Sequence, residues 1–374
     1  MCDNMLRKFT VENFRNFRDP ITLDFSKKHE YQFNDYCIKD GLISKMVVFG
    51  ENGSGKSNLG LALFDIVAVL TDNECEQIID GDAIFLNADS GKRMATFTYE
   101  FKFGDTIVEY TYKKSKPEKI DSETVTINGL LAIKYTRQSH KLIIGVGEAA
   151  KTLNFDNKPD HLSVVRFIYN NSKLDEDDPV ALIVKFANKM LWFRSLHNRN
   201  YIGFRKGSQN IAEYLVEKNK VPEFEKFLEK VAGIKVSLSS YRDPITQQVR
   251  LIERHAKKSL NFMDAASTGT RELLLFFFWS MFFEEVSFLF VDEFDAFYHF
   301  ELSRELIKYV AQLNNVQAVF TSHNTYLASN EVLRPDCYMK LRDGQIYSFA
   351  DSTTRELREG HNIEKMLRNG EFDG

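Results

Sequence analysis

The feature that most constrains this chain is a glycine-rich segment, GENGSGKS, at residues 50–57. It matches the pattern G-x-x-x-x-G-K-[ST], in which glycines let backbone N–H groups turn toward a chain of phosphates. An apolar run at 43–49 precedes it, and an apolar helical pattern over 56–70 follows it. A strand, a loop and a helix in this order place the helix N-terminus at the phosphates. A chance glycine-rich turn would not need this context, so we predict a phosphate-binding loop.

The loop predicts both a nucleotide and a metal ion. The Lys56 ammonium would neutralise the β- and γ-phosphates of ATP, and the Ser57 hydroxyl would bind Mg²⁺. ATP and Mg²⁺ are therefore the expected cofactors. The residues predicted to bind the nucleotide in this part of the chain are Gly50, Asn52, Gly53, Ser54, Gly55, Lys56, Ser57 and Asn58.

A second apolar run, FLFV at 288–291, ends in the acids Asp292 and Glu293. A buried strand that stops at carboxylates delivers them to the edge of the sheet where ligands bind. Asp292 would hold Mg²⁺, and Glu293 would polarise the attacking water. Taken alone, the pattern also fits a strand that ends in solvated acids. The phosphate loop favours the catalytic interpretation, with Lys56 and Asp292 meeting at one site although they lie far apart in the sequence.

Apolar strand-like runs alternate with helical patterns in both outer thirds of the chain, which indicates an α/β fold. Strands are expected at 6–11, 21–25, 43–49, 236–238, 249–252, 288–291, 316–321, 338–341 and 345–349, and an antiparallel β-subdomain at 96–144. Helices are expected at 56–70, 267–285 and 299–313, and a helical pattern, split near Pro222, over 180–232. We therefore expect a nucleotide-binding domain built from 1–145 and 256–374, with a helical or mixed insertion at 146–255.

The bulk composition excludes several classes of protein. The net charge of −4 over 374 residues argues against a chain that is basic overall, so nucleic acid could bind only at a local patch. The four cysteines are widely spaced and fit free thiols in a reducing cytoplasm. The N-terminus lacks the apolar core of a signal peptide, and the longest apolar run, 273–283, is too short to span a bilayer. We expect a cytoplasmic protein without membrane contact.

Several segments together resemble the ABC-type ATPase heads of the SMC/RecF group, and most closely compact prokaryotic ATPases of anti-phage and abortive-infection loci. The segment FTVENFRNF at 9–17 resembles the opening strand and turn of that group. DEFDAFYH at 292–299 resembles its acidic strand end and the loop that follows, and TSHN at 321–324 resembles its switch histidine segment. NIEKM at 362–366 and GEF at 370–372 resemble a tail of the defence ATPases.

The resemblance implies a P-loop ABC-ATPase head, with a mixed central sheet, an antiparallel β-subdomain and an inserted helical lobe. It also implies a homodimer or a higher oligomer of heads, in which each ATP lies between the phosphate loop of one subunit and the signature segment of another. ASTGT at 266–270 occupies the signature position, so Ser267 and Gly269 would contact the γ-phosphate across the interface. Thr268 departs from the LSGGQ consensus, and a plain helix N-cap is the alternative.

Three further residues take roles from the resemblance. His323 would sense the γ-phosphate, Asp295 would bridge the two subunits, and Arg15 of the opening turn would contact nucleotide. An ordinary surface histidine and a solvated acid are the alternatives for the first two. The glutamine of the family's Q-loop is not identifiable, and Gln77 and Gln138 stay open as candidates.

The resemblance favours a slow, dimerisation-dependent ATPase switch in anti-phage defence, which controls a separately encoded effector such as a nuclease. The alternative is a RecF/SMC-like DNA-repair ATPase that binds DNA directly. A basic stretch with interleaved rings could grip a nucleic-acid backbone or a protein, or simply be solvated; its residues are Arg194, His197, Arg199, Arg205 and Lys206, with Trp192, Phe193, Tyr201 and Phe204. About fifty residues follow His323, too few for an appended nuclease domain. The large insertion argues against a transporter subunit.

Overall fold

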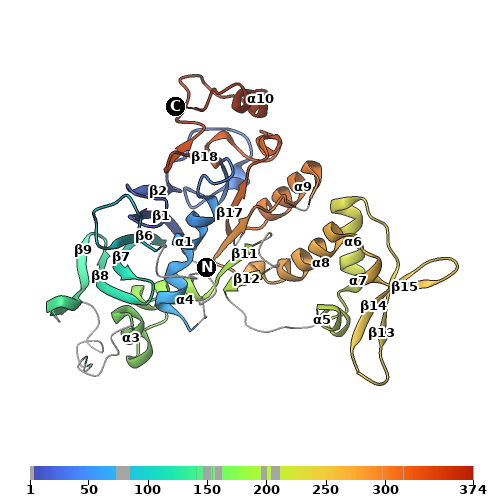
Figure 1. Cartoon of the computed structure of the whole chain (residues 1–374), viewed down its shortest axis with the longest axis horizontal. Helices are drawn as coiled ribbons and strands as arrows, with labels where there is room; N and C mark the ends of the chain where they lie inside the picture. Colours follow the sequence, from blue (N-terminus) through green and yellow to red (C-terminus); the bar gives the residue numbers. More distant parts are fainter. Residues whose placement is uncertain are drawn as a thin grey trace.

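The computed structural model describes residues 4–72, 85–139, 141–145, 153, 155, 162–194, 200–203, 211–296, 298–314 and 316–373. It contains two seven-stranded sheets that face each other across helix α1 (Lys56–Leu70). Figure 1 shows the sheets to the left and centre, with a helical lobe and a projecting β-arm to the right. The expected α/β class is confirmed.

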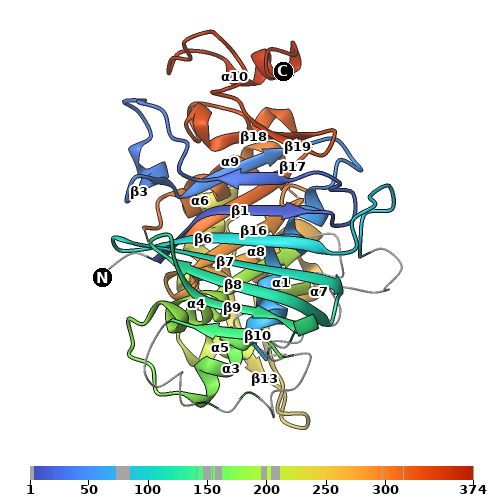
Figure 2. The ribbon, with the colours of Figure 1, turned by 90° about the vertical axis from the view of Figure 1, so that its left-hand side faces the viewer.

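The first sheet is antiparallel and has the strand order β10-β9-β8-β7-β6-β1-β2. Figure 2 shows these strands stacked one below another. Its strands are β1 (Asn4–Glu12), β2 (Ile21–Asp24), β6 (Ala95–Phe103), β7 (Thr106–Lys116), β8 (Lys119–Ile127), β9 (Leu130–Thr136) and β10 (Lys141–Ile144). Buried and partly buried residues alternate along all of β6, as a strand with one face on the core requires. The predicted β-subdomain is confirmed.

The second sheet is mixed and has the order β12-β11-β16-β17-β5-β18-β19. Its strands are β5 (Lys45–Phe49), β11 (Met190–Arg194), β12 (Asn200–Gly203), β16 (Phe288–Asp292), β17 (Gln317–Ser322), β18 (Tyr338–Arg342) and β19 (Gln345–Ser348). The strands from β11 to β18 are parallel, and the two edge strands pair antiparallel. The strand before the phosphate loop and the strand before the two acids are thus separated only by β17.

Helix α1 is apolar on nearly all sides because both sheets cover it. The Tyr99 hydroxyl of β6 donates to the Ala62 carbonyl at 2.9 Å, and the Phe64 ring lies 5.4 Å from the Trp192 ring of β11. Gly60 permits the close approach, since a Cβ there would lie 2.7 Å from the Phe290 ring. A helix with this pattern is stable only in the interior of a domain.

The remaining elements cover the sheets or form the lobe. They are α3 (Val164–Asn171), α4 (Pro179–Asn188), α5 (Ile211–Glu217), α6 (Val221–Ala232), α7 (Phe262–Ala265), α8 (Thr268–Ser280), α9 (Phe300–Ala311) and α10 (Ile363–Arg368), with strands β3 (Ile38–Lys39), β4 (Leu42–Ile43), β13 (Leu238–Arg242), β14 (Val249–Arg254) and β15 (Ser259–Asn261). Short 3-10 turns lie at Asp35–Cys37, Arg137–Ser139, Phe283–Glu285, Thr325–Leu327 and Pro335–Cys337. No helix of the described residues is long and apolar enough to cross a membrane.

Two of the expected helical segments differ from the structure. The helical pattern over 180–232 is interrupted by β11 and β12, because the apolar run MLWF pairs with β16 in the sheet interior. A short, wholly apolar run does not distinguish a buried strand from a buried helix by periodicity. The helix expected over 267–285 ends at Ser280, and the chain turns so that Phe283 packs edge-on against Phe276 at 5.7 Å.

The basic stretch at 194–206 is only partly described. Trp192 and Phe193 are 0% and 8% exposed, so these rings belong to the core and are not available to stack on bases. His197, Arg199, Phe204, Arg205 and Lys206 lie outside the described residues.

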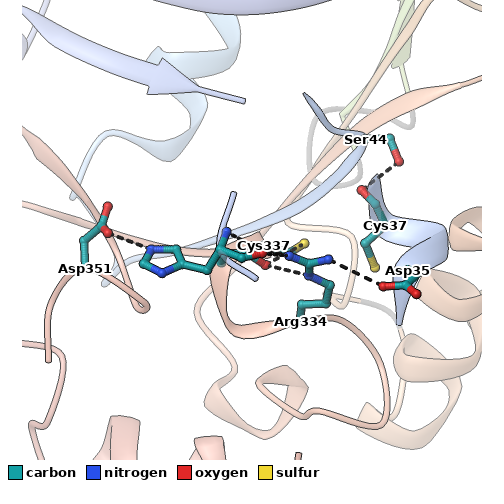
Figure 3. Close-up of polar contacts among 8 residues, drawn as sticks. Asp35, Cys37, Ser44, Arg334, Cys337 and Asp351 are labelled. Carbon is teal, nitrogen blue, oxygen red and sulfur yellow. Dashed lines mark hydrogen bonds and ion pairs between the residues drawn. The ribbon is translucent and has the colours of Figure 1, made fainter. Parts of the chain in front are cut away.

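A buried ion pair formed by Arg334, which is labelled in Figure 3, lies where the segment around His29 meets residues 334–351. The Arg334 guanidinium donates to the Asp336 carboxylate at 2.7 Å, and both side chains are at most 4% exposed. The same carboxylate accepts the His29 backbone N–H at 2.7 Å, while the His29 ring bonds to Asp351 at 2.9 Å. The two His29 contacts join residues about three hundred positions apart.

Substitution of Asp336 by Asn should lower the free energy of unfolding by about 3–5 kcal/mol, because it removes the buried counter-charge of Arg334 and leaves only Asp35, which is 3.8 Å away and 80% exposed. The matched control is Glu356→Gln, which breaks a pair of the same 2.7 Å length whose side chains are 72% and 77% exposed. That change should leave the free energy of unfolding nearly unchanged, because solvent screens an exposed pair. Chemical denaturation measures both, and equal losses would contradict the assignment.

Lys45, at the start of β5, is a buried cation without a carboxylate partner in the described chain. Its ammonium donates to the carbonyls of Val316 at 2.7 Å and Leu313 at 3.1 Å, and the residue is 1% exposed. Burial lowers the pKa of Lys45 to about 8. The folded state therefore disfavours the charged form.

Because the pKa of Lys45 is lower in the folded state, the free energy of unfolding should increase as the pH rises. Between pH 8 and about 10.5 the unfolded chain binds the proton that folded Lys45 has lost, so the free energy of unfolding increases by up to roughly 3 kcal/mol. Denaturant titrations of the wild type and Lys45→Met over this window should show the increase in the wild type alone. Parallel pH profiles would contradict the shifted pKa.

Candidate ATP site

The phosphate loop has the backbone that its glycines predict. Gly53 and Gly55 have φ angles of 82° and 105°, in the region that side chains rarely adopt. Lys56 is the first residue of α1, and its ammonium donates to the carbonyls of Gly50 at 2.7 Å and Glu51 at 3.0 Å. The lysine thus lies folded over the loop, which is where a bound phosphate chain would meet it.

Asn16 of the opening turn closes one side of the loop. Its amide donates to the Ser54 carbonyl at 3.2 Å, and its oxygen accepts from Asn58 at 2.7 Å. A Cβ at Gly55 would lie 2.2 Å from the Asn16 amide nitrogen, so the glycine is needed for this contact. The sequence led us to expect that Arg15 contacts nucleotide. It gave no role to Asn16, although Asn16 lies in the same turn. The Arg15 backbone N–H bonds to Phe85 at 3.0 Å, and its contact with nucleotide stays a prediction.

The loop has the electrostatics of an anion site. Burial lowers the pKa of Lys56. The nearby carboxylates oppose that shift, and Glu293 has the largest effect among them. The residue is 4% exposed. The Ser54 hydroxyl oxygen is also buried, and none of the described residues bonds to it. A phosphate would give the Ser54 hydroxyl a hydrogen-bond partner and the Lys56 ammonium an anionic one.

Thr321, at the end of β17, positions both acids. Its hydroxyl donates to Asp292 Oδ1 at 2.6 Å and accepts the Glu293 backbone N–H at 2.9 Å. Asp292 is 4% exposed, and Glu293 has a φ of 47°, which turns the chain sharply out of the strand. Sequence reasoning assigned no role to Thr321. A threonine at the end of the neighbouring buried strand was the available signal.

The residues proposed for Mg²⁺ suit that ion. Ser57 follows Lys56 in the first turn of α1, and Asp292 ends β16. A hydroxyl and a carboxylate are hard oxygen donors, and Mg²⁺ commonly takes one or two such protein ligands and completes its shell with water and phosphate. With Mg²⁺ and ATP bound, these two residues would hold the ion beside the phosphates, and the ion would supply charge stabilisation during phosphoryl transfer.

His323 lies directly beside the loop. It follows β17, and the Gly50 N–H donates to the preceding carbonyl, that of Ser322, at 3.2 Å. His323 itself is exposed. Asp295 is 8% exposed, and burial raises the pKa of its carboxyl against the opposing effects of Ser322 and His323. Its predicted role as a bridge between subunits remains a prediction.

The signature segment lies away from the other site residues. Ser267 caps α8, and its hydroxyl accepts the Thr270 N–H at 3.1 Å, so the N-cap interpretation holds. Ser267 is exposed at the start of a helix, where backbone N–H groups and the helix dipole favour an anion. In Figure 1, α7 and α8 lie to the right of the central strands and α1 to their left. One subunit therefore brings together the loop, the acids and His323, but not Ser267 and Gly269.

The sequence at 45–329 matches the family described as "AAA domain, putative AbiEii toxin, Type IV TA system". The match covers more than half of the chain and includes the phosphate loop and the Asp292–Glu293 strand end. The chain belongs to this AAA-domain family. The relation to abortive-infection ATPases that the sequence suggested is thereby confirmed.

Two solved structures resemble the AAA-domain chain in outline. The SMC head domain from Thermotoga maritima aligns with a TM-score of 0.44 and 15% identity, over 92% of this chain and 98% of that one. The SMC head domain from Pyrococcus furiosus, bound to the C-terminal domain of ScpA, aligns with a TM-score of 0.41 and 13% identity, over 92% and 96%. A search of curated protein sequences returns no match.

Replacement of Thr321 by Val should lower ATP turnover about 10–100-fold, because Asp292 and Glu293 lose the hydroxyl that orients them. Thr321→Ser keeps the hydroxyl and should stay within about threefold of the wild type. Phosphate release measured over a Mg²⁺ titration would separate weaker metal binding from slower chemistry. Full turnover in Thr321→Val would show that Thr321 does not position the acids.

Proposed function

We propose that this chain is an ATP-hydrolysing switch subunit of a cytoplasmic anti-phage defence system, which dimerises through ATP and controls a separately encoded effector. The proposal rests on one observation: the predicted site residues fall into two groups that do not meet within one subunit. Lys56, Asp292 and Glu293 converge in one subunit, whereas the exposed start of α8 points to a second one. The family description, with its putative AbiEii toxin, supports the defence role.

The chemistry follows from the residues that converge. Lys56 and the loop N–H groups would bind the phosphates, and Mg²⁺ on Ser57 and Asp292 would neutralise charge. Glu293, held by its backbone bond to Thr321, would orient and deprotonate the attacking water. Ser267 and Gly269 of the partner would complete the γ-phosphate contacts. A lone subunit would then hydrolyse ATP slowly, so ATP would hold two heads together until hydrolysis releases them.

A second candidate function is direct DNA binding by a repair ATPase. One face of the β13–β15 arm favours it, because Tyr241 pairs with Arg250 across the strands, and Arg254 follows on the same face. Tyr241 is 47% exposed, and both arginines are exposed. Duplex DNA should accelerate ATP turnover if this function holds, and should leave turnover unchanged in the defence switch.

The first test is the mass of Glu293→Gln by light scattering, with and without ATP and Mg²⁺. The substitution removes the base and keeps the side-chain volume, so ATP should bind without being hydrolysed. We expect at least twice the monomer mass with ATP, and the monomer without it. A monomer that has ATP bound would overturn the sandwich and the role of the signature segment.

Two additional variants locate the interface. Ser267→Arg, combined with Glu293→Gln, should restore the monomer in ATP, because the bulky cation occupies the γ-phosphate contact. Asn362→Arg is the matched control, since Asn362 also caps a helix and accepts the Lys365 N–H at 2.8 Å. Each substitution removes a helix cap and should cost about 1 kcal/mol of stability. Only Ser267→Arg should prevent dimerisation.

A further inference from the structure

A pocket of about 520 Å³ lies where three segments meet, outside the ATP site. Its walls come from the start of α9, from the turn Thr325–Leu327 and the residues that follow it, and from residues 359–364, which lead into α10. Figure 1 shows α10 close to the C-terminus and apart from the helical lobe. We call this the output pocket and define it by Phe300, Tyr326, Asn330, Glu331, Glu359 and Glu364.

The acids of the output pocket are in excess of its cations. Glu331 and Glu359 are exposed, and neither forms an ion pair with any described residue. The third acid, Glu364, pairs with Arg368 at 3.4 Å. Arg304, the one arginine in the wall, is engaged with the chain itself, donating from Nε to the Tyr326 carbonyl at 2.9 Å. The pocket therefore presents two carboxylates to whatever enters it.

Asn330 lies in the wall of the output pocket and ties its segments together. It is 7% exposed, and its amide nitrogen donates to the carbonyls of Arg358 at 2.9 Å, Glu359 at 3.0 Å and His361 at 3.2 Å. With its nitrogen committed, the orientation of the amide is fixed.

Two rings give the pocket an affinity for flat cations. The rings of Phe300 and Tyr326 lie 5.4 Å apart, and Tyr326 is 48% exposed. Each already has one guanidinium of this chain over it, with Arg304 5.8 Å from the Phe300 centroid and Arg368 5.9 Å from the Tyr326 centroid. Guanidinium groups stack on aromatic faces and carry several N–H donors, so they match both the rings and the acceptors.

We propose that the output pocket binds an arginine side chain presented by a partner protein. The two unpaired carboxylates supply the counter-charge and hydrogen-bond acceptors, and the half-exposed Tyr326 ring supplies a surface for stacking. The pocket volume lies within the range of small-ligand sites and is ample for one side chain with part of its backbone.

The pocket is built from the segments that flank the ATP site. Tyr326 follows His323 by one short turn, and α9 follows the loop that contains Glu293 and Asp295. The bond from Arg304 to the Tyr326 carbonyl ties these two segments together. A change of nucleotide at His323 would therefore alter the pocket. This coupling rests on the proposed function, whereas arginine binding does not.

The test uses the nucleotide-free full chain and a blocked arginine, Nα-acetyl-L-arginine N-methylamide, followed by saturation-transfer NMR. The control ligand is the blocked citrulline, which has the same shape without the charge. We expect at least a fivefold tighter dissociation constant for the arginine. Equal binding of the two ligands, or none of either, overturns the proposal whether or not the chain hydrolyses ATP.

Two double variants test whether Glu331 and Glu359 form the arginine-binding site. Glu331→Gln with Glu359→Gln should weaken arginine binding at least tenfold, while the same charge change on α9, Glu301→Gln with Glu305→Gln, should leave it unchanged. Free arginine distinguishes the source, because its own carboxylate would be repelled by the pocket acids. Tighter binding of free than of blocked arginine would assign the pocket to a small metabolite, and retained binding in the first double variant would place the arginine elsewhere.

Discussion

The fold depends on the burial of α1 between two sheets. The helix begins at the lysine that would bind phosphate, so whatever fixes α1 also fixes the loop. Asp65 on this helix is buried, and it accepts the Lys114 ammonium at 2.8 Å and the Tyr112 hydroxyl at 2.9 Å. These charge-assisted bonds run from the helix to the antiparallel sheet, while Phe64 packs on the parallel one. A rigid helix between rigid sheets gives the phosphate loop a fixed base, as a preorganised site requires.

Adjacent parallel strands deliver the rest of the site. The end of β17 meets the ends of β16 and β5, so Thr321 reaches across to the two acids while the next carbonyl binds the start of the loop. The register of the sheet, with Ser322 opposite Phe49, sets this arrangement. Catalytic groups at the carboxyl edge of a parallel sheet thus need no long side chains, since the strand spacing already brings them within hydrogen-bond reach.

The same short connections run from the candidate ATP site to the output pocket. The chain runs from His323 through one turn to Tyr326, and from Glu293 through one loop to α9. Both routes end at the output pocket. A switch needs an element that nucleotide and partner both influence, and segments that touch the two sites satisfy this condition without a long-range pathway. The start of α8, where Ser267 is exposed, is not part of the output pocket, so the proposed second head and the proposed partner would use different surfaces.

The sequence by itself determined the phosphate loop, the bounds of α1, the acids at the end of β16 and the α/β class. These depend on residues close in the chain and on their periodicity. Only the tertiary structure decided that MLWF at 190–193 is an interior strand, that Asn16 closes on Gly55 and that Thr321 orients the acids. It also placed Asn330 beside residues 358–361. Such contacts join distant segments, and neither propensity nor local pattern encodes which distant segment a residue will meet.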